Sequence, residues 1–348
     1  MTTLHLLLPG SLDQLTGGTL YDRRIVAGLR AQGRAVGVHE LDGGFPQPSA
    51  AALASADAAL AGLADDAPTI IDGLAFGAMP EVAARHAARL RLVALVHHPL
   101  ALETGLDAAL AERLRASESA ALRHARRVIV TSRQTARLLA DFDVPAARIR
   151  VVEPGTEPAP LAMGSGGDGP LRLVAVGTVT PRKGHLLLIE ALGRLRHLDW
   201  RLDCAGSLDR DPTTAAALRA RIEALGLGER VRLLGELPPA ALEPHYARAD
   251  LFVLASLFEG YGMAYAEALA RGLPVLGTTG GAIADTVPAD AGLLVPPGDV
   301  EALHDALVRL LTDAALRRDL AAGAARARAG LPDWPAAAAR FAEALADV

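Results

Sequence analysis

The sequence has very little cysteine, few aromatic residues and no excess of positive charge. Its single cysteine, Cys204, allows neither an intrachain disulfide nor a metal site built from several thiolates. Aromatic residues make up only 3% of the chain, which argues against a binding surface of stacked rings. The net charge of -5 at pH 7 excludes a general basic field, so no nucleic-acid partner is expected.

A cationic leader and long apolar runs are also missing. The start, MTTLHLLLPG, carries no lysine or arginine, and no stretch of about 18 uncharged apolar residues follows it. We therefore expect a cytoplasmic protein. Hydrophobic residues nevertheless make up 51% of the 348 residues, which excludes a disordered chain and is enough for the cores of two domains.

Lysine is the scarcest charged residue in the chain. Lys183 is the only lysine, and the other 34 of the 35 basic residues are arginine. An ammonium group is a compact point charge, whereas a guanidinium group is a planar fork, so the two are not equivalent. The surroundings of Lys183 are therefore the first place to look for a functional site.

Short apolar runs alternate with longer amphipathic or alanine-rich segments in both halves of the chain. Strands separated by helices pair in parallel, so the sequence predicts an α/β fold of two Rossmann-like domains facing each other across a cleft. We expect the first domain over 1–155 and the second over 171–332. Residues 156–170, rich in proline and glycine, are interpreted as a linker. A helix at about 333–348 is expected to pack back onto the first domain.

Several apparent signatures fail on their context. The glycines of Gly164–Gly169 have dinucleotide-binding spacing, but they precede a predicted strand instead of following one. Gly260 and Gly262 do follow a strand, yet Tyr265 occupies the third glycine position. Asp141-Phe-Asp143 and Asp209-Arg-Asp211 resemble metal-binding pairs but lie in predicted turns, where aspartate is common. A metal-dependent enzyme that uses one of these pairs remains an alternative.

The segment GTVTPRKGH, residues 177–185, contains the only lysine. It follows a predicted strand and opens the next helix, so Arg182 and Lys183 lie at the carboxyl edge of the sheet. Two cations beside a helix N-terminus form an anion site, because the backbone N–H groups and the helix dipole add to the formal charge. The alternative is solvated surface charge, although cations at a helix start do not favour helix stability. We predict a phosphate-binding site here.

The stretch SLFEGYGMAYAEALARGLPVLGTTGG, residues 256–281, is the most informative one. Glu259 lies in a predicted turn after a buried strand, and Glu267 follows eight positions later in an otherwise apolar helix. A carboxylate in such a turn can accept hydrogen bonds from sugar hydroxyls, while the N–H groups of the turn hold a pyrophosphate. The alternative for Glu267 is an i,i+4 ion pair with Arg271, which contributes only about 0.3–0.5 kcal/mol.

The first domain has two further candidates. Gly17 and Gly18 separate the first strand from a helix predicted to start at Thr19, and paired glycines let a backbone approach a ligand closely. His97 and His98 follow a strand whose end points into the predicted cleft. A histidine at such a position is as often a structural residue as a functional one.

Taken together, these motifs resemble the retaining, nucleotide-sugar-dependent glycosyltransferases of family 4, which have the GT-B fold. The matching features are Gly17-Gly18, His97, the Arg182-Lys183-Gly184 segment after Gly177, and the E-x7-E pair of Glu259 and Glu267. The resemblance covers nearly the whole chain and is specific in the second half. One departure is VVEPG at 151–155, where many members of the family have V-x-P-N-G.

The resemblance implies roles for individual residues on the donor side. Arg182 and Lys183 would bind the donor diphosphate and balance the charge of the leaving group. Glu259 would hold the transferred sugar and Glu267 the ribose. The N–H groups of the turn after Glu259 would also contact the donor; they belong to Gly260, Tyr261, Gly262 and Met263.

Further contacts are implied for glycines and for the first domain. Gly17 and Gly18 would approach the diphosphate, and His97 would contact the sugar near the reacting carbon. Gly177 would line the donor site, and the nucleobase would touch backbone near Gly206 and Leu237. The catalytic set is therefore His97, Arg182, Lys183 and Glu259, and no metal ion or other cofactor is needed.

The function implied is sugar transfer, with retention, from a nucleoside diphosphate sugar to a hydroxyl acceptor such as a glycan, a lipid-linked sugar or a small metabolite. A UDP-sugar is slightly favoured and GDP-mannose comes next. The alternatives are a nucleotide-sugar epimerase of the same architecture and a catalytically silent sugar-nucleotide-binding partner. The Arg-rich region 108–150 indicates weak peripheral contact with the inner face of a membrane, although a solvated helix face explains it equally well.

Overall fold

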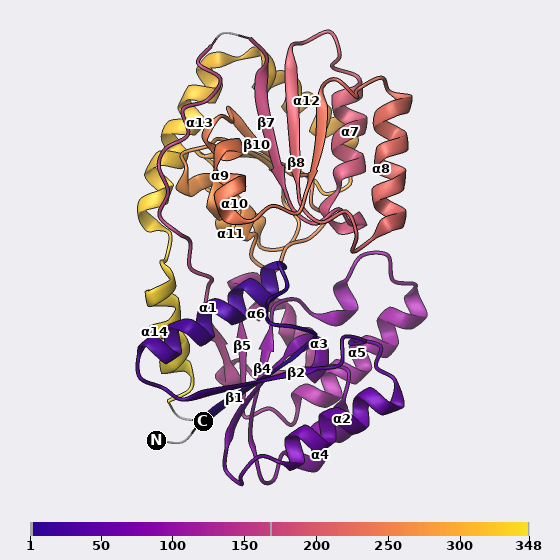
Figure 1. Ribbon diagram of the computed structural model, residues 1–348, viewed down its shortest axis with the longest axis vertical. Helices are drawn as coiled ribbons and strands as arrows, with labels where there is room; N and C mark the ends of the chain where they lie inside the picture. Colours follow the sequence, from indigo (N-terminus) through magenta and orange to yellow (C-terminus); the bar gives the residue numbers. More distant parts are fainter. Residues whose placement is uncertain (1–2, 168, 347) are drawn as a thin grey trace. The chain divides into compact units, whose positions relative to one another are not determined.

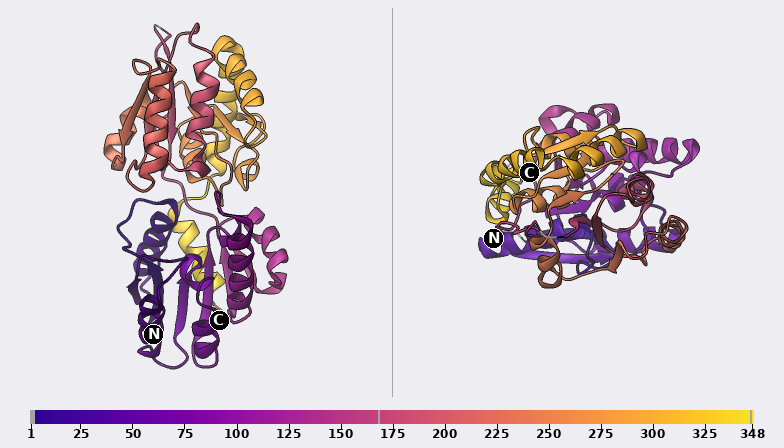
Figure 2. Two further views of the ribbon diagram at one scale, coloured as in Figure 1. Left: turned by 90° about the vertical axis from the view of Figure 1, so that its right-hand side faces the viewer. Right: turned by 90° about the horizontal axis from the view of Figure 1, so that it is seen from above.

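The computed structural model describes residues 3–167, 169–346 and 348, which divide into two compact units. Unit 1 comprises the chain up to Gly155 and again from Pro332 onward, and unit 2 comprises Thr156–Leu331. Both chain ends therefore belong to unit 1 (Figure 2). No helix among the described residues is long and apolar enough to cross a membrane.

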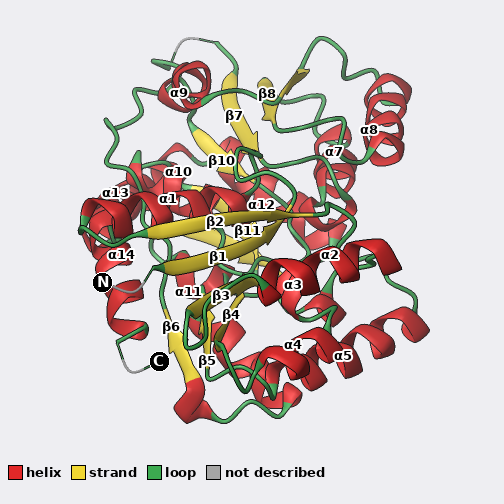
Figure 3. Cartoon of the chain, turned by 60° about the horizontal axis from the view of Figure 1, so that its bottom comes forward, coloured by secondary structure: helices red, strands yellow, loops and turns green. Residues whose placement is uncertain are grey.

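Unit 1 is built on a six-stranded parallel sheet in the order β2-β1-β3-β4-β5-β6 (Figure 3). The inner strands β3 and β4 are buried along almost their whole length, as expected where helices cover both faces of a parallel sheet. The strands are β1 Leu4–Pro9, β2 Val36–Leu41, β3 Pro68–Asp72, β4 Arg91–Val96, β5 Arg127–Val130 and β6 Ile149–Val151.

Seven helices belong to unit 1 among the residues described. They are α1 Gly17–Ala31, α2 Ala50–Ala61, α3 Gly73–Phe76, α4 Pro80–His86, α5 Ala108–Leu122, α6 Arg133–Leu138 and α14 Trp334–Ala344. Helix α1 starts two residues earlier than the sequence indicates, because Thr16 caps it and forms a reciprocal pair of hydrogen bonds with Thr19. Gly17 and Gly18 thus form the first turn of the helix instead of a loop before it.

Helix α14 returns to unit 1 from the far end of the sequence and packs along α1 (Figure 1). Its buried Trp334 and Phe341 rings lie 6.1 and 6.5 Å from the ring of Tyr21, between ring centroids. A Cβ atom on Gly28 would lie only 2.4 Å from the Cβ atom of Ala338, so the two helices approach as closely as glycine permits. The last helix therefore completes the core of the first unit.

This packing predicts a large loss of stability when Phe341 is shortened. Phe341 is 1% exposed, so Phe341→Ala leaves a cavity and should lower the free energy of unfolding by about 3–5 kcal/mol. The matched control is Arg340→Ala, on the exposed side of the same helix. It should change the free energy of unfolding by no more than about 0.5 kcal/mol. Denaturant unfolding of the whole chain measures both; equal effects would show that α14 does not stabilise unit 1.

Unit 2 is a second six-stranded parallel sheet, in the order β12-β11-β10-β7-β8-β9. The strand order reverses between β7 and β10, which are neighbours although two strands separate them in sequence. Loops that follow such a pair diverge to opposite faces of the sheet and leave a crevice at its carboxyl edge. The strands are β7 Leu171–Val176, β8 Trp200–Ala205, β9 Val231–Gly235, β10 Leu251–Val253, β11 Val275–Thr278 and β12 Gly292–Val295.

The helices of unit 2 lie on both faces of this sheet, with α7 and α8 side by side (Figure 1). They are α7 His185–Gly193, α8 Pro212–Ala224, α9 Pro239–Ala247, α10 Met263–Ala270, α11 Ile283–Thr286, α12 Val300–Thr312 and α13 Ala314–Ala327. The proline- and glycine-rich segment interpreted as a linker is attached to this unit. Main-chain N–H groups of Ala162 and Met163 donate to carbonyl oxygens of Arg271 and Ala247, each over 2.8 Å.

Candidate active site

Two loops meet at the carboxyl edge of unit 2, one after β7 and one after β10. The main-chain N–H of Leu257 donates to the carbonyl oxygen of Arg182 over 2.7 Å and ties the loops together. Gly184, with a φ of 66°, ends the first loop and caps α7. A Cβ atom there would lie 1.9 Å from the carbonyl oxygen of Ala255, so glycine is required for the loops to approach.

Charged side chains from the two loops form a compact cluster. Lys183 donates from Nζ to Oε1 of Glu259 over 2.7 Å, and Arg182 donates to Oε2 of Glu259 over 3.3 Å. Ser256 donates to Oε1 of the same carboxylate over 2.6 Å. Arg182 also donates to the carbonyl oxygen of Phe258 over 2.9 Å. The topology of the sheet thus brings Glu259 to Lys183 and Arg182, which precede it by 76 and 77 positions in the sequence.

The cluster carries a net positive charge. Burial would raise the pKa of Glu259, but Lys183, Arg182 and the hydrogen bonds from Lys183 and Ser256 outweigh it and lower the pKa to about 2. Burial and the charge of Lys183 lower the pKa of His185, next in the chain, to about 4. At pH 7, two cations therefore face one carboxylate and a neutral imidazole. The side chains of Lys183 and Arg182 are 15% and 26% exposed, so a second anion can reach them.

Predicted donor-site glycines lie directly beside this cluster. A Cβ atom on Gly206 would lie 2.0 Å from the carbonyl oxygen of Gly177, and a Cβ atom on Gly177 would lie 3.3 Å from Cδ of Lys183. Gly206 also donates its N–H to the carbonyl oxygen of Gly235 over 2.8 Å. Leu237 is half-buried and lies on the loop that follows. Small residues here leave space around the lysine.

The turn after Glu259 leads directly into α10. Gly262, with a φ of 95°, caps the helix, and Met263 is its first residue. The carbonyl oxygen of Tyr261 accepts a hydrogen bond from Oγ1 of Thr286 over 2.6 Å. Gly260, Tyr261, Gly262 and Met263 thus present the start of a helix beside the cations, which favours a bound anion.

Glu267 lies one to two turns into α10 and is held by a different set of contacts. Tyr246 donates its hydroxyl to Oε2 of Glu267 over 3.1 Å. Arg271 forms an ion pair with Glu243, at 2.5 Å, and donates to the main-chain oxygen of Glu267 over 2.9 Å. The carboxylate of Glu267 is therefore bound by Tyr246, and the side chain of Arg271 is paired with Glu243 instead. Burial raises the pKa of Glu267, with the charge of Arg271 opposing the shift.

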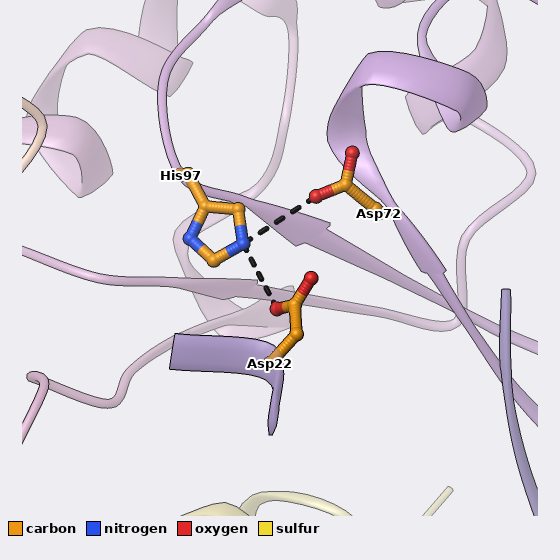
Figure 4. A group of neighbouring side chains, drawn as sticks. All are labelled: Asp22, Asp72 and His97. Atoms are coloured by element: carbon orange, nitrogen blue, oxygen red, sulfur yellow. Dashed lines mark hydrogen bonds and ion pairs between the residues drawn. The ribbon is translucent and has the colours of Figure 1, made fainter. Parts of the chain in front are cut away.

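Unit 1 brings a second cluster together around His97 (Figure 4). Nε2 of His97 lies 3.0 Å from Oδ1 of Asp22 and 3.4 Å from Oδ2 of Asp72. Asp72 ends β3 and caps α3, Asp22 lies in α1, and His97 follows β4. Nδ1 of His97 points away from both carboxylates. Gly18 lies against the ring, since a Cβ atom there would be 3.4 Å from Cδ2 of His97.

The two carboxylates determine the charge of His97. Burial would lower its pKa, but Asp22 and Asp72 outweigh burial and raise the pKa to about 10. Burial raises the pKa of Asp22, and the charge of His97 opposes that shift. His97 is thus an imidazolium at neutral pH whose Nδ1–H is not directed at either aspartate.

Known protein families match both halves of this chain. Residues 170–313 match the family described as glycosyl transferases group 1, and residues 14–155 match the glycosyl transferase 4-like domain. The fold agrees: sucrose-phosphate synthase from Thermosynechococcus elongatus superposes with a TM-score of 0.82 over 98% of both chains, at 23% identity. The chain belongs among the GT-B glycosyltransferases.

Curated relatives of this glycosyltransferase act on several substrates. The MMP alpha-(1->4)-mannosyltransferase of Mycolicibacterium hassiacum is 28% identical over 85% of the chain and 74% of that protein. A GDP-mannose-dependent phosphatidylinositol monomannoside mannosyltransferase of Mycolicibacterium smegmatis is 34% identical, and a D-inositol 3-phosphate glycosyltransferase of Salinispora tropica is 32% identical. The matched segments span about half the length of these last two proteins. HepE of Anabaena, solved with UDP-glucose, has a TM-score of 0.77 and 19% identity, with both chains fully covered.

Sequence patterns did not single out four contributors to these clusters: Asp22, Asp72, Ser256 and Tyr246. Asp72 ends β3, and its position at the carboxyl end of a strand could have singled it out. Asp22 gives no signal, because it is one acid among the polar residues of an amphipathic helix. Ser256 was inside the quoted motif but had no assigned role. Its hydrogen bond to Glu259 depends on the conformation of the turn.

The candidate metal-binding pairs are explained by local structure. Asp211 caps α8 through its contacts with Thr214, and Asp143 has a left-handed backbone and lies 3.6 Å from Arg123. Within the described ranges, the trio of Asp22, Asp72 and His97 is the one group with three suitable ligand atoms close together. Its histidine already bridges both carboxylates.

Three arginines of the Arg-rich region 108–150 make contacts within unit 1. Arg127 is buried and donates to the carbonyl oxygen of Ala344, and Arg148 donates to the carbonyl oxygen of Ala125. Arg115 lies 4.8 Å from the ring centre of Phe142. These contacts account for three of the arginines that indicated a membrane-facing surface, so this surface offers less charge than the sequence indicates.

Proposed function

We propose that the chain transfers a sugar from a nucleoside diphosphate sugar to a hydroxyl acceptor with retention of configuration. The observation that carries the proposal is the cluster of Arg182, Lys183 and Glu259 at the strand-order reversal of unit 2. Ligands of open α/β sheets bind at such a point, and two cations beside helix starts suit a diphosphate. The names of the relatives, which include GDP-mannose-dependent and inositol-phosphate enzymes, support the same class of reaction.

The cations act on the leaving group. When the bond between the sugar and the diphosphate breaks, negative charge grows on the β-phosphate oxygen. Lys183 and Arg182 are fixed by Glu259 before the reaction starts, so they stabilise this charge with little reorganisation. The N–H groups at the starts of α7 and α10 add to the effect. This charge also removes the need for a divalent metal ion.

Glu259 serves as an anchor in this mechanism. Its pKa of about 2 and its hydrogen bonds from Lys183, Arg182 and Ser256 make the carboxylate a poor nucleophile. Since a carboxylate has about four lone-pair sites, one remains for a sugar hydroxyl. We infer that the acceptor attacks from the face that the diphosphate leaves, and that the departing phosphate takes the proton of the acceptor hydroxyl. His97 would contact the transferred sugar through Nδ1–H.

The donor is best identified by a thermal-shift panel. The panel contains UDP, GDP, ADP and their sugars, with UDP-glucose and GDP-mannose as the first candidates. All three nucleotides are included because contacts between the base and the protein backbone would not discriminate between them. A ligand at 100 times its dissociation constant adds about 2.7 kcal/mol of stability. We expect one nucleotide family to raise Tm in wild type and not in Lys183→Ala, with or without EDTA.

Other outcomes would redirect the proposal. Binding that disappears with EDTA would indicate a metal-dependent enzyme. Isomerisation of the sugar nucleotide without any acceptor would indicate an epimerase. Binding of a sugar nucleotide without transfer to any hydroxyl compound would indicate a silent binding partner. No shift with any nucleotide would contradict the donor site itself.

A further inference from the structure

A cavity of about 140 Å³ lies at the opposite edge of the unit 2 sheet from the donor loops. Arg172, Arg201 and Arg232 line it from the second positions of β7, β8 and β9, and Arg248 lines it from the end of α9. Between Arg172 and Gly177 the chain runs five residues along β7, or about 17 Å at 3.3 Å per residue. The cavity is therefore separate from the cluster around Lys183.

The strand register places two of these arginines side by side. Arg172 and Arg201 are direct partners across the β7–β8 ladder, so both side chains leave the same face of the sheet. Like charges in neighbouring positions of a sheet are destabilising. Among the residues that the structure describes, neither guanidinium has a carboxylate oxygen within 4 Å. An anion bound between the two side chains would offset this unfavourable pairing.

The one acid in the cavity is already used. Asp203 accepts two hydrogen bonds from Arg232, both of 2.7 Å, and its Oδ2 lies 2.7 Å from Nδ1 of His245. Arg248 caps the C-terminal end of α9, where the helix dipole favours a cation. That explanation does not extend to Arg172 and Arg201, which lie on strands. Asp250 accepts from the main-chain N–H of Arg172 over 2.8 Å and from Ser165, so among the described residues the guanidinium groups of Arg172 and Arg201 have no ion-pair partner.

The geometry points to a binding site in this cavity for the phosphate group of a small molecule, distinct from the donor site. Planar guanidinium groups bind phosphate oxygens in pairs, and a dianionic phosphomonoester balances the charges of Arg172 and Arg201. The cavity is concave and small, which suits one phosphate group better than an extended polymer. The phosphate would belong to a free phosphorylated metabolite or to a phospholipid headgroup.

Titration calorimetry with inorganic phosphate and glycerol 3-phosphate tests this site. Wild type should bind both saturably, and Arg172→Gln/Arg201→Gln should weaken binding at least tenfold. Two controls separate this site from others: Arg219→Gln, on the exposed face of α8, should bind like wild type, and Lys183→Ala, in the donor cluster, should keep the phosphate binding that the double variant loses. Because a repulsion is removed, the double variant should also have a higher Tm than wild type when no phosphate is present.

The source of the phosphate is decided with phosphatidylcholine vesicles that contain or lack phosphatidic acid. Vesicle binding that needs phosphatidic acid and is displaced by glycerol 3-phosphate supports a headgroup, and binding of the free compounds alone supports a metabolite. Absence of saturable binding by wild type, or equal binding by the double variant, would overturn the inference. Loss of donor binding in Lys183→Ala with intact phosphate binding keeps this result independent of the proposed transferase activity.

Discussion

Replacing Lys183 by alanine should lower kcat for sugar transfer by about 10²–10³-fold, the usual cost of removing one preorganised group that stabilises developing negative charge. Lys183 is the only lysine, and it is fixed by Glu259 at 2.7 Å beside the start of α7. Arg196→Ala, an exposed cation just beyond the end of the same helix, is the matched control and should leave kcat unchanged. Transfer at the wild-type rate by Lys183→Ala would contradict the mechanism.

The same substitution should change the pH dependence of stability. The pKa of Glu259 is lowered to about 2 in the folded chain from an ordinary value of 4.5, so its contribution is present above pH 4.5 and is lost as the pH falls toward 2. Lys183→Ala leaves this buried carboxylate with Arg182 as its remaining cation. We expect the free energy of unfolding to fall by about 1.5–3 kcal/mol at pH 7, the contribution of one hydrogen bond to a charged group, and the loss to shrink in acid. Kinetics should therefore be measured where circular dichroism shows the variant to be folded.

Replacing Asp22 by asparagine should lower kcat by about 10- to 100-fold at neutral pH. In the proposed mechanism Asp22 is a positioning residue, because its carboxylate, together with that of Asp72, keeps His97 protonated, and it lies 3.0 Å from the ring. The loss corresponds to one charge-assisted hydrogen bond, about 1.5–3 kcal/mol, from Nδ1–H of His97 to the sugar. Asp13→Asn, at an exposed position before α1, is the control and should have no effect.

The pH profile distinguishes positioning from a merely structural role. The pKa of His97 is raised to about 10, so His97 should keep its proton below that pH. Wild-type activity should therefore not decline through loss of this proton below that pH. In Asp22→Asn the pKa of His97 should fall toward 6.5, and activity should then decline as the pH rises through neutrality. The contribution of the imidazolium to wild-type stability is complete below pH 6.5 and is lost toward pH 10. An unchanged profile in Asp22→Asn would rule out this role.

The sequence was sufficient to predict the alternating fold and the donor-side loops, because both depend on local patterns. Strand-then-helix alternation implies parallel sheets, and residues after parallel strands meet at one edge. Lys183 and Glu259 could therefore be assigned to one site although 76 positions separate them. Their direct ion pair was not predictable, because it depends on side-chain orientation in a turn.

The cluster around His97 shows where such reasoning ends. Asp22, Asp72 and His97 come from α1, the end of β3 and the loop after β4, and only the tertiary arrangement of these elements brings them together. The arginine cavity of unit 2 likewise depends on register. A shift of one residue between β7 and β8 would send Arg172 and Arg201 to opposite faces.

The return of α14 to unit 1 has a consequence for the order of folding during synthesis. Unit 2 is an insertion within unit 1, so residues 156–331 leave the ribosome before residues 332–348. Tyr21 cannot bury its ring against Trp334 and Phe341 until these two residues have been synthesised. The unit that is translated first is therefore the one that is completed last, while the unit that carries Lys183 can already be folded.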